Sequence, residues 1–125
     1  MTEKYVVYVD DEEDLADIFH SIVEDEVTPH GCQLKVFSSP TEAQTFINQN
    51  EVQLLMVDYR MPEMSGVELI ESLTRKPQNC MVITGEILDK TTTDLPVLMK
   101  PIDFDDFFEK LPAYLGKAWL GTARG

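Results

Sequence analysis

The chain has 125 residues, of which 43% are hydrophobic and 9% aromatic, a composition typical of one globular domain with a full hydrophobic core. Its 23 acidic and 10 basic residues give a net charge of −13, which argues against direct nucleic-acid binding, because that requires clustered Lys and Arg. No apolar run is long enough to span a membrane and the N-terminus does not resemble a signal peptide, so we expect a cytoplasmic protein whose cysteines, Cys32 and Cys80, stay reduced in the core.

The first part of the chain is predicted to form a strand and then a helix. Residues 5–9 (YVVYV) are a continuous apolar run rich in β-branched residues, typical of a strand covered on both faces. Across 11–27, apolar residues recur at helical spacing with acidic residues opposite them, which predicts an amphipathic helix. The side chains expected on its apolar face are Leu15, Ile18, Phe19, Ile22 and Val23.

A second strand and helix follow. Residues 33–37 (QLKVF) predict a short strand, and residues 39–50 a helix with strong start signals. Ser39 can cap this helix, Pro40 suits its first position, and Glu42 completes a capping box with Ser39.

The alternation continues through the middle of the chain. Apolar runs predict strands at 52–57, 79–84 and 95–100, with Pro96 near the start of the last one, where a strand tolerates proline best. The spacing of apolar residues at 66–76 predicts a helix between the first two of these strands.

The closing segment, 102–120, is expected to be helical. Asp103 is its expected N-cap, and Pro112 should bend the helix. Its apolar stripe consists of Phe104, Phe107, Phe108, Leu111, Leu115 and Trp119.

Strands and helices thus alternate along the chain, and several strands are apolar almost throughout. This pattern predicts an α/β fold, a doubly wound five-stranded parallel sheet in the flavodoxin-like order 2-1-3-4-5. In such sheets ligands bind beyond the carboxyl ends of the strands, at the point where the strand order reverses.

Side chains capable of chemistry fall at these carboxyl ends. Asp10 and Asp11 follow the first strand, and Asp58 ends the third, its neighbour in the predicted order. Carboxylates crowded into one crevice repel each other, and a hard divalent cation removes that penalty. Oxygen ligands alone suit Mg²⁺ better than zinc. The fourth strand ends in Thr84, a hydroxyl, and the fifth in Lys100, an ammonium.

Short motifs therefore occupy the predicted strand ends in order: Asp10–Asp11, Asp58 followed by MPEMSG, Thr84–Gly85 and Lys100–Pro101. Together they resemble the receiver domain of bacterial two-component response regulators, and the resemblance covers essentially the whole chain, so we expect a single receiver domain over 1–125. It implies a signalling domain, not a classical enzyme, that accepts a phosphoryl group on Asp58 from a sensor histidine kinase or phosphotransfer protein. It further implies autodephosphorylation, and output through contacts with an unknown protein.

The resemblance also implies how the metal would be held. Asp11, Asp58 and the backbone carbonyl of Arg60 would bind Mg²⁺, with Asp10 acting through water. An ionised carboxylate such as that of Asp58 is a ready nucleophile, and its catalytic need is neutralisation of charge.

Other residues are implied to act on the phosphoryl group or to shape its site. Lys100 would pair with one phosphoryl oxygen, and Thr84 would hydrogen-bond another. The family usually has a cis peptide bond before the proline that matches Pro101, which would aim the lysine inward. Pro62 and Gly66 would shape the loop over the site.

The sequence departs from the family pattern in two places. Only nine residues, 85–93 (GEILDKTTT), stand where a full fourth helix usually lies, and TTT is a poor helix former, so we predict that this helix is reduced to a turn or absent. The family usually has an aromatic residue three positions before the lysine, which moves after the threonine moves inward. Here that position is Val97. Near the phosphoryl site, Arg60 and Glu86 can pair across the crevice, which would impede water and prolong the phosphorylated state.

Other classes of function fit the sequence less completely. The alternative is a receiver-like interaction module that no longer switches and docks through the shortened fourth segment and Tyr114, Leu115 and Trp119. A hydrolase of the aspartate-nucleophile type is disfavoured because the apparent nucleophile ends the third strand, not the first. A flavin-binding domain is disfavoured because no phosphate-binding loop follows the first strand.

Overall fold

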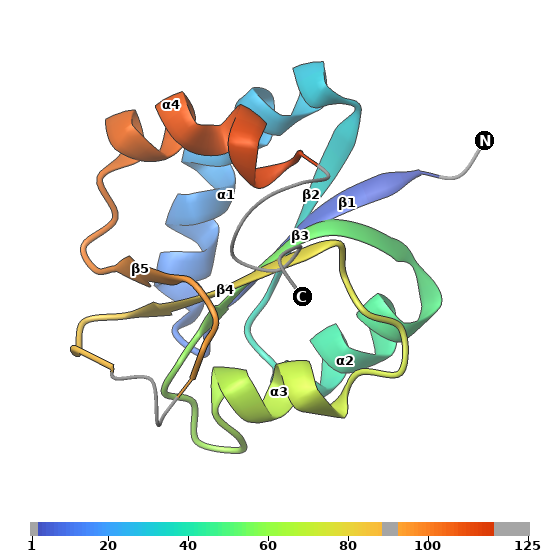
Figure 1. Cartoon of the computed structure of the whole chain (residues 1–125), viewed down its shortest axis with the longest axis vertical. Coiled ribbons are helices and arrows are strands. Elements are labelled where there is room, and N and C mark those ends of the chain that lie inside the picture. The colour runs from blue at the N-terminus through green and yellow to red at the C-terminus, as the bar shows by residue number, and fades with distance from the viewer. Residues whose placement is uncertain (1–2, 89–92, 117–125) are drawn as a thin grey trace.

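A computed structural model describes residues 3–88 and 93–116, which form one five-stranded sheet with helices on both faces (Figure 1). The strand order is β2-β1-β3-β4-β5, and every neighbouring pair is parallel. The predicted doubly wound fold is therefore confirmed. The strands are β1 (Lys4–Val9), β2 (Cys32–Phe37), β3 (Glu51–Asp58), β4 (Asn79–Thr84) and β5 (Val97–Met99).

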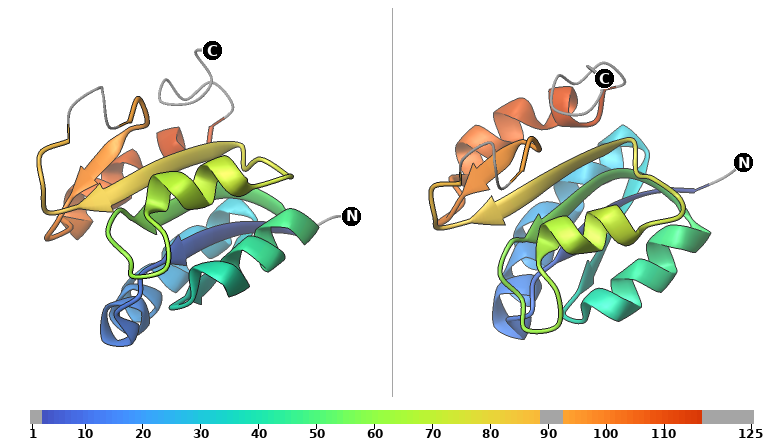
Figure 2. Two further views of the ribbon diagram at one scale, coloured as in Figure 1. Left: turned by 90° about the horizontal axis from the view of Figure 1, so that it is seen from below. Right: turned by 60° about the horizontal axis from the view of Figure 1, so that its bottom comes forward.

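The helices cover the sheet in two layers. Helices α1 (Glu13–Val27) and α4 (Phe104–Tyr114) lie on one face, and α2 (Pro40–Gln49) and α3 (Gly66–Ser72) on the other (Figures 1 and 2). Successive strand residues point to opposite faces, so each central strand feeds both layers. This is why the central strands are apolar almost throughout instead of alternating.

The buried face of α1 differs from the predicted one. Phe19 and Val23 are buried as expected, but Leu15, Ile18 and Ile22 are 37%, 51% and 39% exposed. The ring of Phe19 stacks on Tyr8 of β1, with ring centroids 3.9 Å apart, which fixes the rotation of the helix. Because the apolar stripe is wider than the strip that the sheet covers, its outer half stays on the surface.

The predicted capping box is only half formed. The Ser39 side chain accepts a hydrogen bond from the Glu42 backbone N–H at 3.4 Å and caps α2, with Pro40 in the first turn. The reciprocal pair is found instead at the start of α3, where Ser65 and Glu68 exchange both hydrogen bonds.

Helix α3 ends at Ser72, not at Lys76 as predicted. The Asn48 side-chain carbonyl, from α2, accepts the backbone N–H groups of Thr74 and Arg75 at 2.9 and 3.3 Å. These two groups therefore bond to a neighbouring helix, and the chain leaves the helical path before it enters β4.

The connection between β4 and β5 agrees with the predicted loss of the fourth helix. Its described residues, 85–88 and 93–96, contain no helix, and residues 89–92 lie outside the described part of the chain. Strand β5 is also shorter than the predicted 95–100. Pro96 joins the sheet only through its carbonyl, which accepts the Val82 N–H at 2.9 Å, because proline has no N–H to donate.

Helix α4 begins as predicted. Asp103 is its N-cap and accepts the Asp106 N–H at 3.1 Å. The helix ends at Tyr114, and Pro112 lies inside its last turn. The predicted stripe residue Trp119 lies outside the described residues.

Cys32 and Cys80 are free and buried, as predicted. Burial raises the pKa of the Cys80 thiol to about 12, so this thiol stays protonated and unreactive. Across the described residues, no helix combines the length and the apolar character needed to cross a membrane.

Candidate functional site

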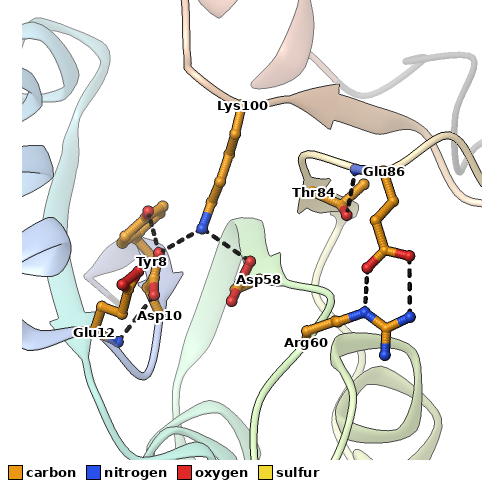
Figure 3. A network of polar contacts seen from close by, with 8 residues as sticks. All are labelled: Tyr8, Asp10, Glu12, Asp58, Arg60, Thr84, Glu86 and Lys100. Atoms are coloured by element: carbon orange, nitrogen blue, oxygen red, sulfur yellow. Dashed lines mark hydrogen bonds and ion pairs between the residues drawn. The ribbon is translucent and has the colours of Figure 1, made fainter.

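The carboxyl ends of β1, β3, β4 and β5 bring the predicted site residues to one edge of the sheet (Figure 3). Val9 of β1 is paired with Val57 of β3, so the next residues on these strands, Asp10 and Asp58, leave the sheet side by side. Asp10 is 0% and Asp58 8% exposed. Two buried carboxylates in one place need positive charge to offset their desolvation.

Lys100 supplies one positive charge. Its Nζ lies 3.0 Å from Asp58 Oδ1 and 3.2 Å from Asp10 Oδ2, so one ammonium bridges both carboxylates (Figure 3). Lys100 therefore points inward, as the sequence led us to expect. The Lys100–Pro101 peptide bond is cis, which was also expected.

Asp11 joins these two acids. Asp10, Asp11 and Asp58 each offer a carboxylate oxygen, and these oxygens all lie within 4.8 Å of one another. Lys100 neutralises one of the three negative charges, so the cluster keeps an excess of two. Oxygen-only ligands with excess negative charge fit a hard divalent cation such as Mg²⁺, and this set of residues is able to hold one.

The electrostatics of Asp58 reflect this crowding. Burial, together with the charges of Asp10 and Asp11, raises its pKa above the ordinary range, although the contact with Lys100 works in the opposite direction. Burial on its own lowers the pKa of Lys100, but contacts with Asp58 and Asp10 outweigh it and the net shift is upward. Lys100 therefore stays charged, and the ionised form of Asp58 is held at a cost to the fold.

Replacing Asp58 should consequently stabilise the metal-free protein. A carboxyl group with a higher pKa in the folded state destabilises the fold once the pH exceeds its unfolded-state pKa. Because asparagine does not ionise, we expect Asp58→Asn to raise the free energy of unfolding by roughly 1–2 kcal/mol near neutral pH. Urea denaturation in EDTA, followed by circular dichroism, measures this difference.

The gain should shrink under two conditions. Lowering the pH through the elevated pKa of Asp58 protonates the wild-type carboxyl group, and adding Mg²⁺ stabilises the wild-type folded state selectively. Asp17→Asn, on the exposed face of α1, removes one charge away from the site and is the matched control. A metal-free Asp58→Asn protein less stable than wild type would contradict this account of the charge balance.

Thr84 and Glu86 lie on the β4 side of the site. Thr84 is buried, and its hydroxyl accepts the Glu86 backbone N–H at 3.1 Å. The Glu86 carboxylate in turn accepts two hydrogen bonds from the Arg60 guanidinium, through Nε and through Nη2, the latter at 3.0 Å (Figure 3). This pair lowers the pKa of Glu86 and raises that of Arg60. The predicted pairing of Arg60 with Glu86 is therefore present.

Gly66 holds the loop after β3 close to Asp58. Its N–H donates to the Tyr59 carbonyl at 2.9 Å, and a Cβ atom at this position would lie 2.7 Å from the Asp58 backbone oxygen. Only glycine permits this approach. At Gly85, by contrast, a Cβ atom would meet nothing within 4 Å, so that glycine faces open space.

Sequence reasoning missed two contacts of Asp10. The Tyr8 hydroxyl donates to Asp10 Oδ2 at 2.9 Å, and the Glu12 backbone N–H donates to Oδ1 at 3.0 Å. Burial, followed by the charge of Asp10, raises the pKa of Tyr8, so the hydroxyl keeps its proton. A detectable signal was present, because Tyr8 has a polar-tipped side chain and lies two residues before Asp10, hence on the same face of the strand.

Comparison with known proteins agrees with this geometry. The family described as response regulator receiver domain matches residues 6–111. The regulatory protein VanRc of Enterococcus gallinarum is 30% identical over 95 residues, which are 74% of this chain and 39% of that protein. The cyclic di-GMP phosphodiesterase response regulator RpfG of Xanthomonas campestris is 36% identical over 76 residues, 59% of this chain and 19% of that protein. The chain thus spans less than half the length of either curated relative.

A solved structure shows the same fold. The CheY-like response regulator receiver domain protein of Methanospirillum hungatei superposes with a TM-score of 0.72 at 23% identity, covering 90% of this chain and 93% of that one. The parallel sheet in the order β2-β1-β3-β4-β5, the acidic cluster at its carboxyl edge and the family match over residues 6–111 lead to one conclusion. The chain belongs to the response regulator receiver domain family.

Proposed function

We propose that Asp58 is the phosphoacceptor of a two-component signalling pathway and receives its phosphoryl group from a phosphohistidine. The donor is a sensor histidine kinase or a phosphotransfer protein. One observation carries the proposal: the carboxylate at the end of β3 lies 3.0 Å from the Lys100 ammonium, beside two further acids able to hold a metal. A nucleophile on a rigid central strand, next to positive charge, is what phosphoryl transfer to a carboxylate requires.

The transfer exchanges one bond for another. An Asp58 carboxylate oxygen attacks phosphorus and forms a P–O bond while the P–N bond to the donor histidine breaks. The electron pair of that bond returns to the imidazole nitrogen, which takes up a proton. No general base is needed, because the carboxylate is already ionised.

Electrostatics then decide the rate. Negative charge accumulates as an anionic carboxylate meets an anionic phosphoryl group, and positive groups already in place lower that barrier. Lys100 contacts one phosphoryl oxygen and the Thr84 hydroxyl donates to another. Asp11, Asp58 and the Arg60 backbone carbonyl would hold Mg²⁺, with Asp10 acting through water. The metal would supply positive charge that offsets the charge of the carboxylates and of the phosphoryl group.

The wider role follows from the same assignment. The phosphorylated domain signals through protein contacts in the cytoplasm, without binding nucleic acid directly, and its own chemistry is limited to self-phosphorylation and autodephosphorylation. The strongly acidic composition supports a protein partner over a nucleic acid.

Phosphorylation by a small donor tests the proposal. Incubation with acetyl phosphate and Mg²⁺ should give an acid-stable, base-labile adduct with the mass of one phosphoryl group, detected by intact-protein mass spectrometry. Asp58→Asn should abolish the adduct, EDTA should suppress it, and Asp17→Asn should leave it unchanged. An adduct that persists on Asp58→Asn would identify a different acceptor.

The Arg60–Glu86 pair should set the lifetime of the phosphorylated state. The pair lies beside Thr84 (Figure 3). In the phosphorylated state it would restrict the approach of water to phosphorus. We expect Arg60→Ala to speed autodephosphorylation roughly threefold to tenfold, because the barrier to water entry is removed. Decay of the isolated phosphoprotein gives this rate, with the exposed Arg75→Ala as the matched control. Equal decay of Arg60→Ala and wild type would rule out this role.

A further inference from the structure

Tyr8 is an unusual residue near the carboxyl end of β1, because its buried neighbours in that strand are valines. It is 2% exposed, and its ring stacks on Phe19 with an interplanar angle of 4°, so the side chain is fixed in one orientation. A buried hydroxyl needs a hydrogen-bond partner, and this one donates to Asp10 Oδ2 at 2.9 Å (Figure 3). Aliphatic neighbours such as Val6 and Val9 fill the same strand without such a contact.

Asp10 receives three hydrogen-bond donors. Oδ1 accepts the Glu12 N–H, whereas Oδ2 accepts both the Tyr8 hydroxyl and the Lys100 ammonium. Two of these donors belong to fixed groups, a backbone and a stacked ring. The third is shared, because Lys100 also contacts Asp58.

This sharing creates a conflict during phosphoryl transfer. Lys100 has to turn from Asp10 toward an oxygen of the incoming phosphoryl group, and Oδ2 of the buried Asp10 then keeps the Tyr8 hydroxyl as its one remaining described donor. A buried carboxylate that loses a donor holds more strongly to the remaining cation. Whatever else donates to Oδ2 therefore governs how easily Lys100 leaves.

We propose that Tyr8 is a positioning residue that holds Asp10 and thereby releases Lys100 to the phosphoryl group. The inference rests on the proposed phosphorylation of Asp58. The Tyr8 hydroxyl stays on Asp10 Oδ2 throughout the reaction. Asp10 therefore keeps its orientation and two hydrogen bonds after Lys100 has moved. Without that hydroxyl, Lys100 stays on Asp10 and the transfer slows.

The first measurement is kinetic. Tyr8→Phe keeps the stacked ring and removes only the hydroxyl, and we expect it to slow phosphorylation by acetyl phosphate roughly fivefold to tenfold. Tyr5→Phe removes a hydroxyl from the same strand, where the ring packs against Phe46 on the other face of the sheet, and should leave the rate unchanged. Far-ultraviolet circular dichroism verifies that both variants are folded.

The second measurement separates positioning from packing. In a Lys100→Ala background there is no ammonium to release, so Tyr8→Phe should no longer change the residual rate. In EDTA, without phosphate, the effect of Tyr8→Phe on stability should depend on Lys100 in the opposite way, and be larger when Lys100 is absent. Tyr8→Phe should lower the urea midpoint more in the Lys100→Ala background than in wild type, because Oδ2 then loses the last of its described donors.

The outcomes are distinct. A wild-type protein that takes up no phosphoryl group overturns the proposed function and this inference with it. A phosphorylated wild type whose rate matches that of Tyr8→Phe overturns this inference alone. Equal effects of Tyr8→Phe in both backgrounds, in rate and in urea midpoint, would also overturn it, since they would show that Tyr8 only packs.

Discussion

Lys100→Ala is expected to slow phosphorylation of Asp58 by acetyl phosphate roughly a hundredfold or more, the largest effect of any substitution outside the acceptor itself. The ammonium is the one cationic side chain that the described contacts place on both buried carboxylates. In the transfer it would meet the charge that accumulates between the Asp58 carboxylate and the phosphoryl oxygens. Initial rates of adduct formation at saturating Mg²⁺ measure this loss.

Two controls show that the effect comes from the lost contact with phosphate. Lys110→Ala removes the same charge from an exposed pair with Asp106, 3.1 Å away on α4, and should phosphorylate like wild type. Calorimetric titration of Lys100→Ala should show Mg²⁺ binding at least as tightly as in wild type, because the acidic cluster has lost its internal counter-charge. A near-normal rate, or a rate lost only through weaker Mg²⁺ binding, would contradict the assigned role of Lys100.

The sequence was sufficient for the sheet and for the residues at its edge. Few folds other than a parallel sheet covered by helices fit a sequence of continuous apolar runs separated by amphipathic segments. In the predicted order β1 and β3 are neighbours. Parallel pairing then places the residues after Val9 and Val57 side by side, as the register shows. The proximity of Asp10 and Asp58 was therefore predictable from two short strands, whereas the inward direction of Lys100 was implied only by the resemblance to receiver domains.

Features that depend on contacts between distant segments were not predictable. The end of α3 is set by Asn48, which belongs to another helix and takes over the N–H groups of Thr74 and Arg75. The exposed side of α1 is likewise decided by a partner, since Phe19 is drawn over Tyr8. Helical spacing gives the width of an apolar stripe but not which half the sheet will cover.

The prediction of the site was incomplete because some of its contacts also depend on how separate segments pack. The run YVVYV indicates a buried strand. The position of Tyr8 two residues before Asp10 suggests a shared face, but the hydrogen bond between them depends on side-chain orientations that the sequence does not give. The steric role of Gly66 was foreseen only as a loop-shaping one. The short distance between Gly66 and the Asp58 carbonyl results from how α3 packs on β3. It leads to a second prediction with a large expected effect, a substitution of Gly66.

Gly66→Ala should destabilise the protein by roughly 1–3 kcal/mol, as overpacking of a tight contact does. Alanine favours helix over glycine by about 1 kcal/mol at most, and Gly66 is at the first position of α3, where this gain is small. Against it stands a Cβ atom 2.7 Å from the Asp58 oxygen and 3.0 Å from Val57 Cγ1. Both belong to a central strand paired on its two sides, so α3 and the loop have to move instead.

That movement should reach the chemistry as well. Displacing the loop that carries Arg60 misplaces groups that, in the proposed transfer, have to be aligned with phosphorus, and we expect a further loss of roughly tenfold in phosphorylation rate. Gly85→Ala, where a Cβ atom meets nothing within 4 Å, is the matched control for stability and should change the urea midpoint little. If Gly66→Ala were as stable as Gly85→Ala, the start of α3 would be free to shift, and close packing against β3 could not be what holds the loop that carries Arg60 beside Asp58.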